Sequence, residues 1–321
     1  MGKYTTIMMN AITIQINMKI LITGASGFLG RHLTPRLERG NELLTPTSKQ
    51  LDVSDYDALQ QYFYDHDFDT IIHLAARCGG IGANKNNPAV FFEKNLQMST
   101  NILKLASEFD AIKKMITLGS VCSYPKFTEV PFKEENIWNG YPEETNAPYG
   151  IAKRSLMMGC QYYNQQYGDN FVHLIPVNMY GEYDHFDLQN SHVIPALIRK
   201  MHEAKMSGAS SVTVWGDGSA SREFLYAGDC AEAIELALKL YNSPEPVNIG
   251  TGQEITIKDL VEKIKNVVEY KGDIVYDTTK PNGQPRRCLD TSKAESKLCF
   301  QARTSFDIGL RKTYNWFLKN E

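Results

Sequence analysis

Short runs of apolar residues alternate along the chain with segments in which apolar side chains recur every three to four positions. The runs are typical of buried strands and the longer repeats of amphipathic helices. Strands are predicted at 18–23, 41–46, 69–75, 113–119 and 170–177. Helices are predicted at 28–39, 54–66, 88–109 and 147–168. This alternation predicts an α/β fold, a Rossmann-type doubly wound parallel sheet.

Beyond Gly181 the pattern loosens into a polar stretch at 181–191 and shorter elements. Those elements are helices at 192–206, 227–241, 257–269 and 305–319, and strands at 211–215, 246–249 and 272–277. Ligands of such folds bind beyond the carboxyl ends of the strands, so the later segments are expected to form a cap. The predicted division is a tail at 1–17, a Rossmann domain at 18–180 with 225–250 packing back on it, and a smaller C-terminal α/β lobe that binds substrate, formed by 181–224 and 251–321.

A glycine-rich turn links the first strand to the first helix, in the run Gly24-Ala25-Ser26-Gly27-Phe28-Leu29-Gly30. Glycines in this position permit a tight turn and close backbone approach, and the helix N-terminus offers oriented amides to a pyrophosphate. The order strand, turn and helix therefore predicts a dinucleotide cofactor. The spacing G-x-x-G-x-x-G is the variant found in short-chain dehydrogenase-like proteins.

Tyr149 and Lys153 lie one helical turn apart on the same face of a predicted helix. A phenol titrates near ~10, and a nearby ammonium is expected to lower the pKa of Tyr149 toward neutral pH. The pair predicts proton transfer at a carbonyl or alcohol oxygen, although the same spacing also occurs by chance on helix surfaces.

Three further residues are expected near this pair. Ser120 closes the fourth strand, Cys122 follows two residues later, and His192 opens a later helix. Each also has an ordinary structural interpretation, as a turn-capping serine, a buried thiol and a helix-start histidine respectively.

The composition argues against several classes of binding partner and site. A net charge of −3 gives no electrostatic footprint for nucleic acid. No apolar run is long enough to span a bilayer. The six cysteines are scattered without a C-x-x-C pair, which argues against a disulfide framework or a metal site and fits a reducing cytoplasm.

From about Lys19 to the C-terminus the chain resembles the extended short-chain dehydrogenase/reductase family, and within it the GDP-L-fucose synthase family. The resemblance is carried by GGIGANKNNPAVFFEKNL (79–96), LGSVCSYP (118–125), APYGIAKRS (147–155), NSHVIPALIRK (190–200), VWGDGSASREF (214–224) and KPNGQPRR (280–287). It implies a GDP-linked 4-keto-6-deoxy sugar as substrate, epimerised at carbons 3 and 5 and then reduced at carbon 4.

By this resemblance Cys122 is the base and His192 the acid of epimerisation, whereas Ser120, Tyr149 and Lys153 serve the reduction. The substrate residues it implies are Asn178, His192, Val193, Lys200, Trp215, Arg222, Arg286 and Arg287. Arginine forks suit a diphosphate. Trp215 is assigned to the base or sugar, although a core tryptophan is the simpler interpretation. Some relatives carry arginine in place of Lys200.

The cofactor implied is NADP, as NADPH. Its expected contacts are Gly24, Ser26, Gly27, Phe28, Leu29, Gly30, Ser48, Lys49, Asp52, Leu74, Ala75, Ala76, Tyr149, Lys153, Pro176 and Asn178. The end of the second strand has no acidic residue, which leaves room for a 2′-phosphate. Some relatives place arginines where this chain has Ser26 and Ser48, so Lys49 and Arg31 remain as cationic partners.

Other readings stay open from the sequence. The chain is also consistent with a GDP-sugar 4-keto reductase that epimerises little, with a nucleotide-sugar 4-epimerase or dehydratase, and with a non-catalytic NADP-sensing Rossmann protein. The Tyr149–Lys153 pair argues against the last of these. Dimerisation through the helices at 88–109 and 147–168 is expected from the resemblance alone.

Overall fold

The computed structural model describes residues 17–188, 191–280 and 282–320. A parallel sheet of six strands forms its centre, in the order β2-β1-β3-β4-β5-β9. These strands are β1 (Lys19–Thr23), β2 (Glu42–Leu44), β3 (Thr70–His73), β4 (Lys114–Leu118), β5 (Phe171–Pro176) and β9 (Val247–Ile249). The predicted fold class is confirmed.

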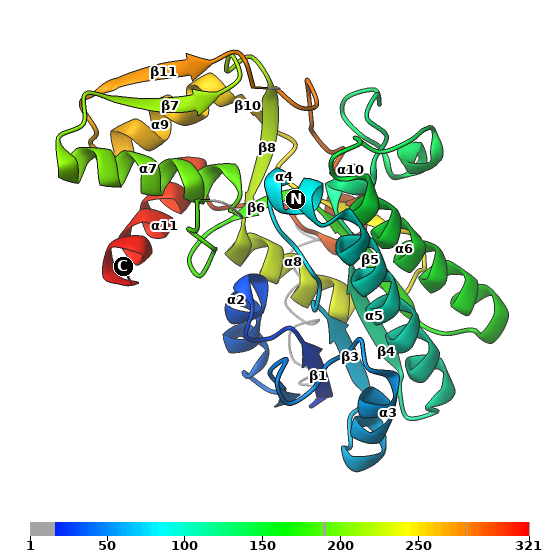
Figure 1. Ribbon diagram of the computed structural model, residues 1–321. Helices are drawn as coiled ribbons and strands as arrows, with labels where there is room; N and C mark the ends of the chain where they lie inside the picture. Colours follow the sequence, from blue (N-terminus) through cyan, green and yellow to red (C-terminus); the bar gives the residue numbers. More distant parts are fainter. Residues whose placement is uncertain (1–16, 189–190, 281, 321) are drawn as a thin grey trace, which may run out of the picture.

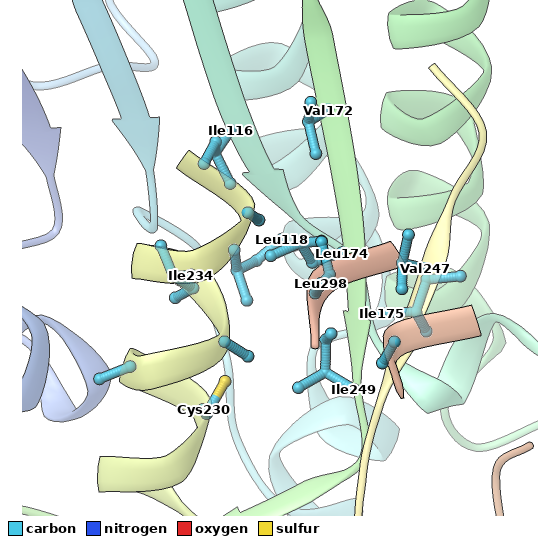
Figure 2. Close-up of a cluster of buried hydrophobic side chains, with 14 of the residues drawn as sticks. Ile116, Leu118, Val172, Leu174, Ile175, Cys230, Ile234, Val247, Ile249 and Leu298 are labelled. Atoms are coloured by element: carbon cyan, nitrogen blue, oxygen red, sulfur yellow. The ribbon is translucent and has the colours of Figure 1, made fainter. Parts of the chain in front are cut away.

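Helices cover both faces of this sheet because alternate strand residues point to opposite sides. Ile20 and Ile22 belong to a core with α2 (Phe28–Leu37), α8 (Ala227–Leu240) and α10 (Ser292–Leu298). Leu21, between them, belongs to a second core with α3 (Tyr56–Asp65), α5 (Pro88–Glu108) and α6 (Ala147–Tyr167). Figure 2 shows part of the first core, in which Ile234 of α8 lies near strand residues of the sheet.

A third hydrophobic core lies in a separate lobe, at the upper left of Figure 1. The lobe contains α7 (Val193–Ser207), α9 (Ile257–Val268) and α11 (Phe306–Asn320). It also contains a three-stranded sheet of β10 (Glu254–Thr256), β8 (Ser221–Tyr226) and β6 (Asn178–Tyr180), and a pair of β7 (Ser211–Trp215) with β11 (Asp273–Asp277). Since β6 follows the carboxyl end of β5, this lobe continues from the edge where ligands of doubly wound sheets bind.

The exact domain boundaries stay a prediction. One segment of the predicted second lobe packs elsewhere: Leu289, Ala294 and Leu298 lie in the first core beside α8. The predicted N-terminal tail lies outside the described residues, apart from Asn17.

Several short elements are absent from the sequence prediction. They are α4 (Ile81–Asn86), β6, β8, β10, α10 and the 3-10 segments η1 (Val121–Ser123) and η2 (Glu134–Trp138). β8 pairs with β6 in parallel and with β10 in antiparallel fashion, so partners distant in sequence define it. Local periodicity carries no such information. Within the described ranges no helix combines the length and apolarity needed to cross a membrane.

Candidate active site

The glycine turn after β1 packs tightly against the segment after β3. Gly24 has φ of +77°, and a Cβ there would lie 2.8 Å from the Ala75 backbone nitrogen. A Cβ at Gly30 would lie 2.4 Å from the Ala25 carbonyl oxygen. Only glycine tolerates the positive φ at Gly24 and the lack of room for a Cβ at both positions. The tight turn keeps its backbone amides close to the start of α2. Two predicted cofactor segments, the glycine turn and the segment around Ala75, therefore lie side by side.

The predicted contacts after β2 are exposed. Ser48 and Lys49 lie in the turn that follows this strand. Asp52 accepts hydrogen bonds from the Ser54 backbone nitrogen and hydroxyl at 2.8 and 2.7 Å, and these bonds lower the pKa of its carboxyl group. β2 ends at Leu44, well before Asp52. The Asp52 carboxylate is thus engaged locally and does not occupy the end of the strand.

The junction of η1 and α6 brings the catalytic candidates together. A Cβ at Gly150 would lie 2.4 Å from the Cys122 carbonyl oxygen, and the Ser123 hydroxyl donates to the Gly150 carbonyl at 3.2 Å. Close packing at Gly150 therefore holds Cys122 near the neighbouring Tyr149. Ser120 caps η1 by accepting from the Cys122 nitrogen at 3.2 Å. Because its oxygen accepts this bond, its hydrogen can be donated to a substrate oxygen.

Tyr149 is buried in surroundings that favour its protonated form. Its phenol oxygen lies 3.4 Å from the Cys78 sulfur, and the Lys153 ammonium lies 5.8 Å from its ring centroid. Burial, with Cys78 and Cys122 adding to it, raises the pKa of Tyr149 well above its usual value. Burial also lowers the pKa of Lys153. The predicted lowering of the Tyr149 pKa is therefore wrong, because desolvation of the phenolate outweighs attraction to the ammonium.

A row of buried polar side chains crosses the sheet at the level of Lys153. The Thr23 hydroxyl lies 2.8 Å from the His73 Nδ1, and the Thr117 hydroxyl lies 2.8 Å from the His173 Nδ1. Burial and the Lys153 charge lower the pKa of both histidines to about 3. Both imidazoles are neutral at physiological pH, so they add no second positive charge near Lys153.

The two adjacent arginines of the predicted diphosphate site have different partners. Arg286 is exposed and forms a two-point ion pair with Glu254 at 3.1 and 2.7 Å. Arg287 is buried; its Nη1 lies 3.7 Å from the Cys122 sulfur and 3.4 Å from the Asn178 Oδ1. The two guanidinium groups therefore have separate partners and do not act as one paired site.

Arg222 and Trp215 lie in the second lobe. Arg222 donates to the carbonyl oxygens of Ser221 and Asn282 at 2.7 and 3.2 Å. Burial and Arg287 lower its pKa to about 10, so it remains charged at neutral pH. Trp215 is 60% exposed, with the ammonium groups of Lys200 and Lys280 at 6.0 and 5.7 Å from the ring centroid. The interpretation of Trp215 as a core residue is wrong.

His192 stands at the N-cap of α7, immediately before Val193. Its side chain keeps solvent access, yet the surrounding protein and His185 lower its pKa. Among the described residues no hydrogen bond joins His192 to Cys122 or Tyr149. The structure thus gathers Ser120, at the N-cap of η1, with Cys122, Tyr149 and Lys153 on η1 and α6, whereas His192 comes from the second lobe.

A family model described as the NAD dependent epimerase/dehydratase family matches residues 20–250. The chain belongs to this family. GDP-L-fucose synthase 1 of Arabidopsis thaliana is 42% identical over 304 residues, covering 94% of each chain. A GDP-6-OMe-4-keto-L-xylo-heptose reductase of C. jejuni superposes with a TM-score of 0.90 at 29% identity, covering 95% of this chain and 99% of the other.

A solved structure from Naegleria fowleri, a GDP-L-fucose synthetase bound to NADP, is also similar to this epimerase/dehydratase family member. The TM-score is 0.87 at 30% identity, and 96% of each chain is covered. The similarity to these relatives therefore extends over nearly the whole chain.

Two side chains at the site were missed by sequence reasoning. Cys78 touches the Tyr149 phenol, and Gln284 accepts two hydrogen bonds from Arg287. Gln284 lies inside one of the strings noted above, and Cys78 directly precedes another. Position within or beside such a string is a signal, but nothing in the residue types indicates which group each would contact.

Proposed function

We propose that this enzyme converts GDP-4-keto-6-deoxy-D-mannose to GDP-L-fucose, by epimerisation at carbons 3 and 5 and NADPH-dependent reduction at carbon 4. The η1–α6 junction carries this proposal, because it packs a thiol, Cys122, close to a phenol, Tyr149. Reduction of a ketone needs a proton donor but no thiol, whereas epimerisation needs a base. Relatives named GDP-L-fucose synthases support the substrate class.

The epimerisation uses the acidity that the ketone gives to its neighbouring C–H bonds. Cys122, as a thiolate, removes the proton from carbon 3 or 5 and leaves an enolate. His192 returns a proton on the opposite face of the sugar, which inverts the centre. The protein lowers the pKa of His192, and the negative diphosphate of the substrate opposes this by favouring the imidazolium.

The reduction uses the groups around Tyr149. NADPH, when bound, supplies a hydride to carbon 4. Tyr149 donates a proton to the alkoxide oxygen, and Ser120 donates a hydrogen bond to the same oxygen. A raised pKa suits this role, since Tyr149 then carries its proton at neutral pH. Lys153 would hold the nicotinamide ribose, and its ammonium supplies a positive charge near the phenol.

The chain offers a fitting cofactor cradle. At Gly24 and Gly30 a Cβ would collide with backbone, which is the close approach that a pyrophosphate needs. The other cofactor contacts predicted from the sequence belong to the same proposal, and Lys49 and Arg31 would lie near the 2′-phosphate. GDP would contact Trp215 through its base or sugar, and its diphosphate would contact Arg222, which stays charged at neutral pH.

We also propose that the enzyme is a homodimer formed through α5 and α6. We further propose that it works in a reducing compartment. Val90 and Phe92 of α5 and Tyr162 of α6 are large apolar side chains with substantial exposure. A dimer interface would remove them from water. Light scattering on a sized column tests the stoichiometry, and a monomeric mass at micromolar concentration would refute the dimer.

A second candidate is reduction of a related GDP-sugar with little epimerisation. The similarity to the C. jejuni heptose reductase favours it, and the presence of Cys122 does not exclude it. Both candidates bind NADPH and reduce a 4-keto group, so binding alone does not separate them.

Product analysis in heavy water separates the candidates. The enzyme is incubated with GDP-4-keto-6-deoxy-D-mannose and NADPH in D₂O, and the sugar is examined by NMR. Deuterium at carbons 3 and 5 of the reduced sugar supports the dual reaction. A reduced sugar without deuterium supports the second candidate, and no turnover of this sugar would refute the conversion to GDP-L-fucose.

A further inference from the structure

Arg287 carries a buried charge without a carboxylate partner. The residue is 7% exposed. No carboxylate oxygen lies within ion-pair distance of it in the described parts of the chain. A second cation, Arg222, lies close enough that the charge of Arg287 helps to lower its pKa. A buried guanidinium in such surroundings gains most from an anion at its free edge.

Gln284 fixes the direction of this guanidinium. Its Oε1 accepts hydrogen bonds from the Arg287 Nε and Nη2 at 3.1 and 3.0 Å. Its Nε2 donates to the carbonyl oxygens of Pro125 and Lys126 at 3.4 and 2.8 Å. Gln284 is itself buried, so both ends of its amide are held.

With two of its nitrogens held by Gln284, Arg287 directs the third toward the active site. Nη1 lies 3.7 Å from the Cys122 sulfur and 3.4 Å from the Asn178 Oδ1. Asn178 offers a neutral oxygen, whereas the sulfur of Cys122 can become negatively charged by losing a proton. Cys122 is therefore the group on this edge that can balance the charge.

We propose that Arg287, oriented by Gln284, is a positioning residue that stabilises the thiolate of Cys122. The inference rests on the proposed function for its purpose, because that function makes Cys122 the epimerisation base. The thiol releases its proton to solvent, the guanidinium balances the negative sulfur, and the thiolate then takes a proton from the sugar carbon. Arg287 keeps all its protons throughout.

The test measures how fast iodoacetamide alkylates Cys122 in the full-length protein, without substrate. The Cys122 peptide is quantified by mass spectrometry after reaction at pH 7 and at pH 9.5. A free thiol titrates near ~8.5, so most of it is ionised at the higher pH whatever its neighbours are. The ratio of the two rates therefore reports stabilisation of the thiolate, whereas mere access to the sulfur affects both rates equally.

In Arg287→Gln the ratio of the rate at pH 9.5 to that at pH 7 should rise about tenfold. Arg287→Lys, which keeps the charge, should restore most of the wild-type ratio. Lys126→Gln is the matched control: it removes a cation four residues from Cys122 whose ammonium is already paired with Glu144. Its ratio should equal that of the wild type.

An unchanged ratio in Arg287→Gln would overturn the proposal, even if both rates fell. If Arg287→Gln does not fold, Gln284→Met decides, since it leaves the guanidinium in place but releases its orientation. A raised ratio in that variant supports the proposal, and a wild-type ratio refutes it. Loss of the proposed function shows up separately, as carbon 3 and 5 exchange that survives Cys122→Ser, because the alkylation assay needs no turnover.

Discussion

The Cys78 sulfur lies 3.4 Å from the phenol oxygen of Tyr149, and this contact joins the loop after β3 to α6. Burial raises the pKa of the phenol, and the Cys78 contact adds to this effect. A phenolate would face a sulfur rather than a strong hydrogen-bond donor, so the environment favours the neutral form. Tyr149 consequently carries its proton at neutral pH and can pass it to an alkoxide, which is a stronger base than a phenolate.

Tyr149 should therefore remain protonated from pH 6 to pH 9. Tyrosinate formation is followed by absorbance at 295 nm, and the titration of Tyr149→Phe is subtracted from that of the wild type. Because burial raises the pKa, the difference should stay near zero until the pH exceeds that of an ordinary phenol, ~10. A difference with a midpoint near pH 7 would contradict the assignment.

Tyr149→Phe should lower reduction at least about a hundredfold yet retain deuterium exchange at carbons 3 and 5, because it removes the proton donor to the alkoxide. Cys122→Ser should do the reverse and cripple exchange. Both rates are measured by NMR in D₂O with the same substrate. If Tyr149→Phe binds substrate but loses all exchange, the division of labour is wrong.

The sequence predicted the parts of this site that depend on local pattern. The glycine turn and the Tyr149–Lys153 spacing follow from a strand, a turn and one helix, each encoded within a few residues. The direction of the Tyr149 pKa did not follow, because it depends first on burial and then on Cys78, which is distant in sequence and reaches the phenol only in the folded chain. Burial, which spacing does not reveal, decides the sign.

The second lobe shows the same limit. Trp215 has the residue type of a core position, but among the described strands β7 pairs with β11 alone, and the indole is exposed. Arg286 and Arg287 are adjacent and chemically equal in the sequence, yet one meets Glu254 and the other Cys122. Which partner each finds is set by how the segment 282–290 crosses between the lobes, and no local pattern encodes that path.

Lys49→Ala should reduce the preference for NADPH over NADH about tenfold, mainly by raising KM for NADPH, because the 2′-phosphate loses a charged partner. Steady-state kinetics with both cofactors measures this. Lys239→Ala is the control, since that ammonium is paired with Glu235 on α8. A wild-type preference ratio in Lys49→Ala would remove Lys49 from the phosphate site, and a wild-type enzyme that prefers NADH would contradict the cofactor assignment itself.

Trp215→Ala should raise KM for the GDP-sugar about tenfold while changing kcat little, because stacking on a nucleobase contributes mainly to binding. Trp138→Ala is a matched control: Trp138 is also exposed and lies under a cation, Arg154. Equal effects of the two substitutions would argue against a substrate contact at Trp215.

Lys114, which lies away from the active site, is expected to contribute to the free energy of unfolding. Its ammonium is buried and donates to the carbonyl oxygens of Ala237 and Leu238 and to the Asn242 side chain at 2.9, 2.7 and 3.0 Å. These bonds satisfy carbonyls at the end of α8. Lys114→Met should therefore lower the free energy of unfolding at pH 7 by about 1–3 kcal/mol, measured by urea denaturation.

The same substitution has a pH dependence of defined sign. Burial lowers the pKa of Lys114 from 10.5 to about 8, so between these values the unfolded chain binds the proton more than the folded one. Stability from this group then rises with pH across that window and is flat below it. The wild type should gain roughly 2–3 kcal/mol over Lys114→Met between pH 7.5 and pH 10. Lys205→Met, which removes a partly exposed lysine bonded to the Val268 carbonyl, controls for general effects of alkali. If the difference in unfolding free energy between wild type and Lys114→Met shrinks as the pH rises, burial does not lower the pKa of Lys114.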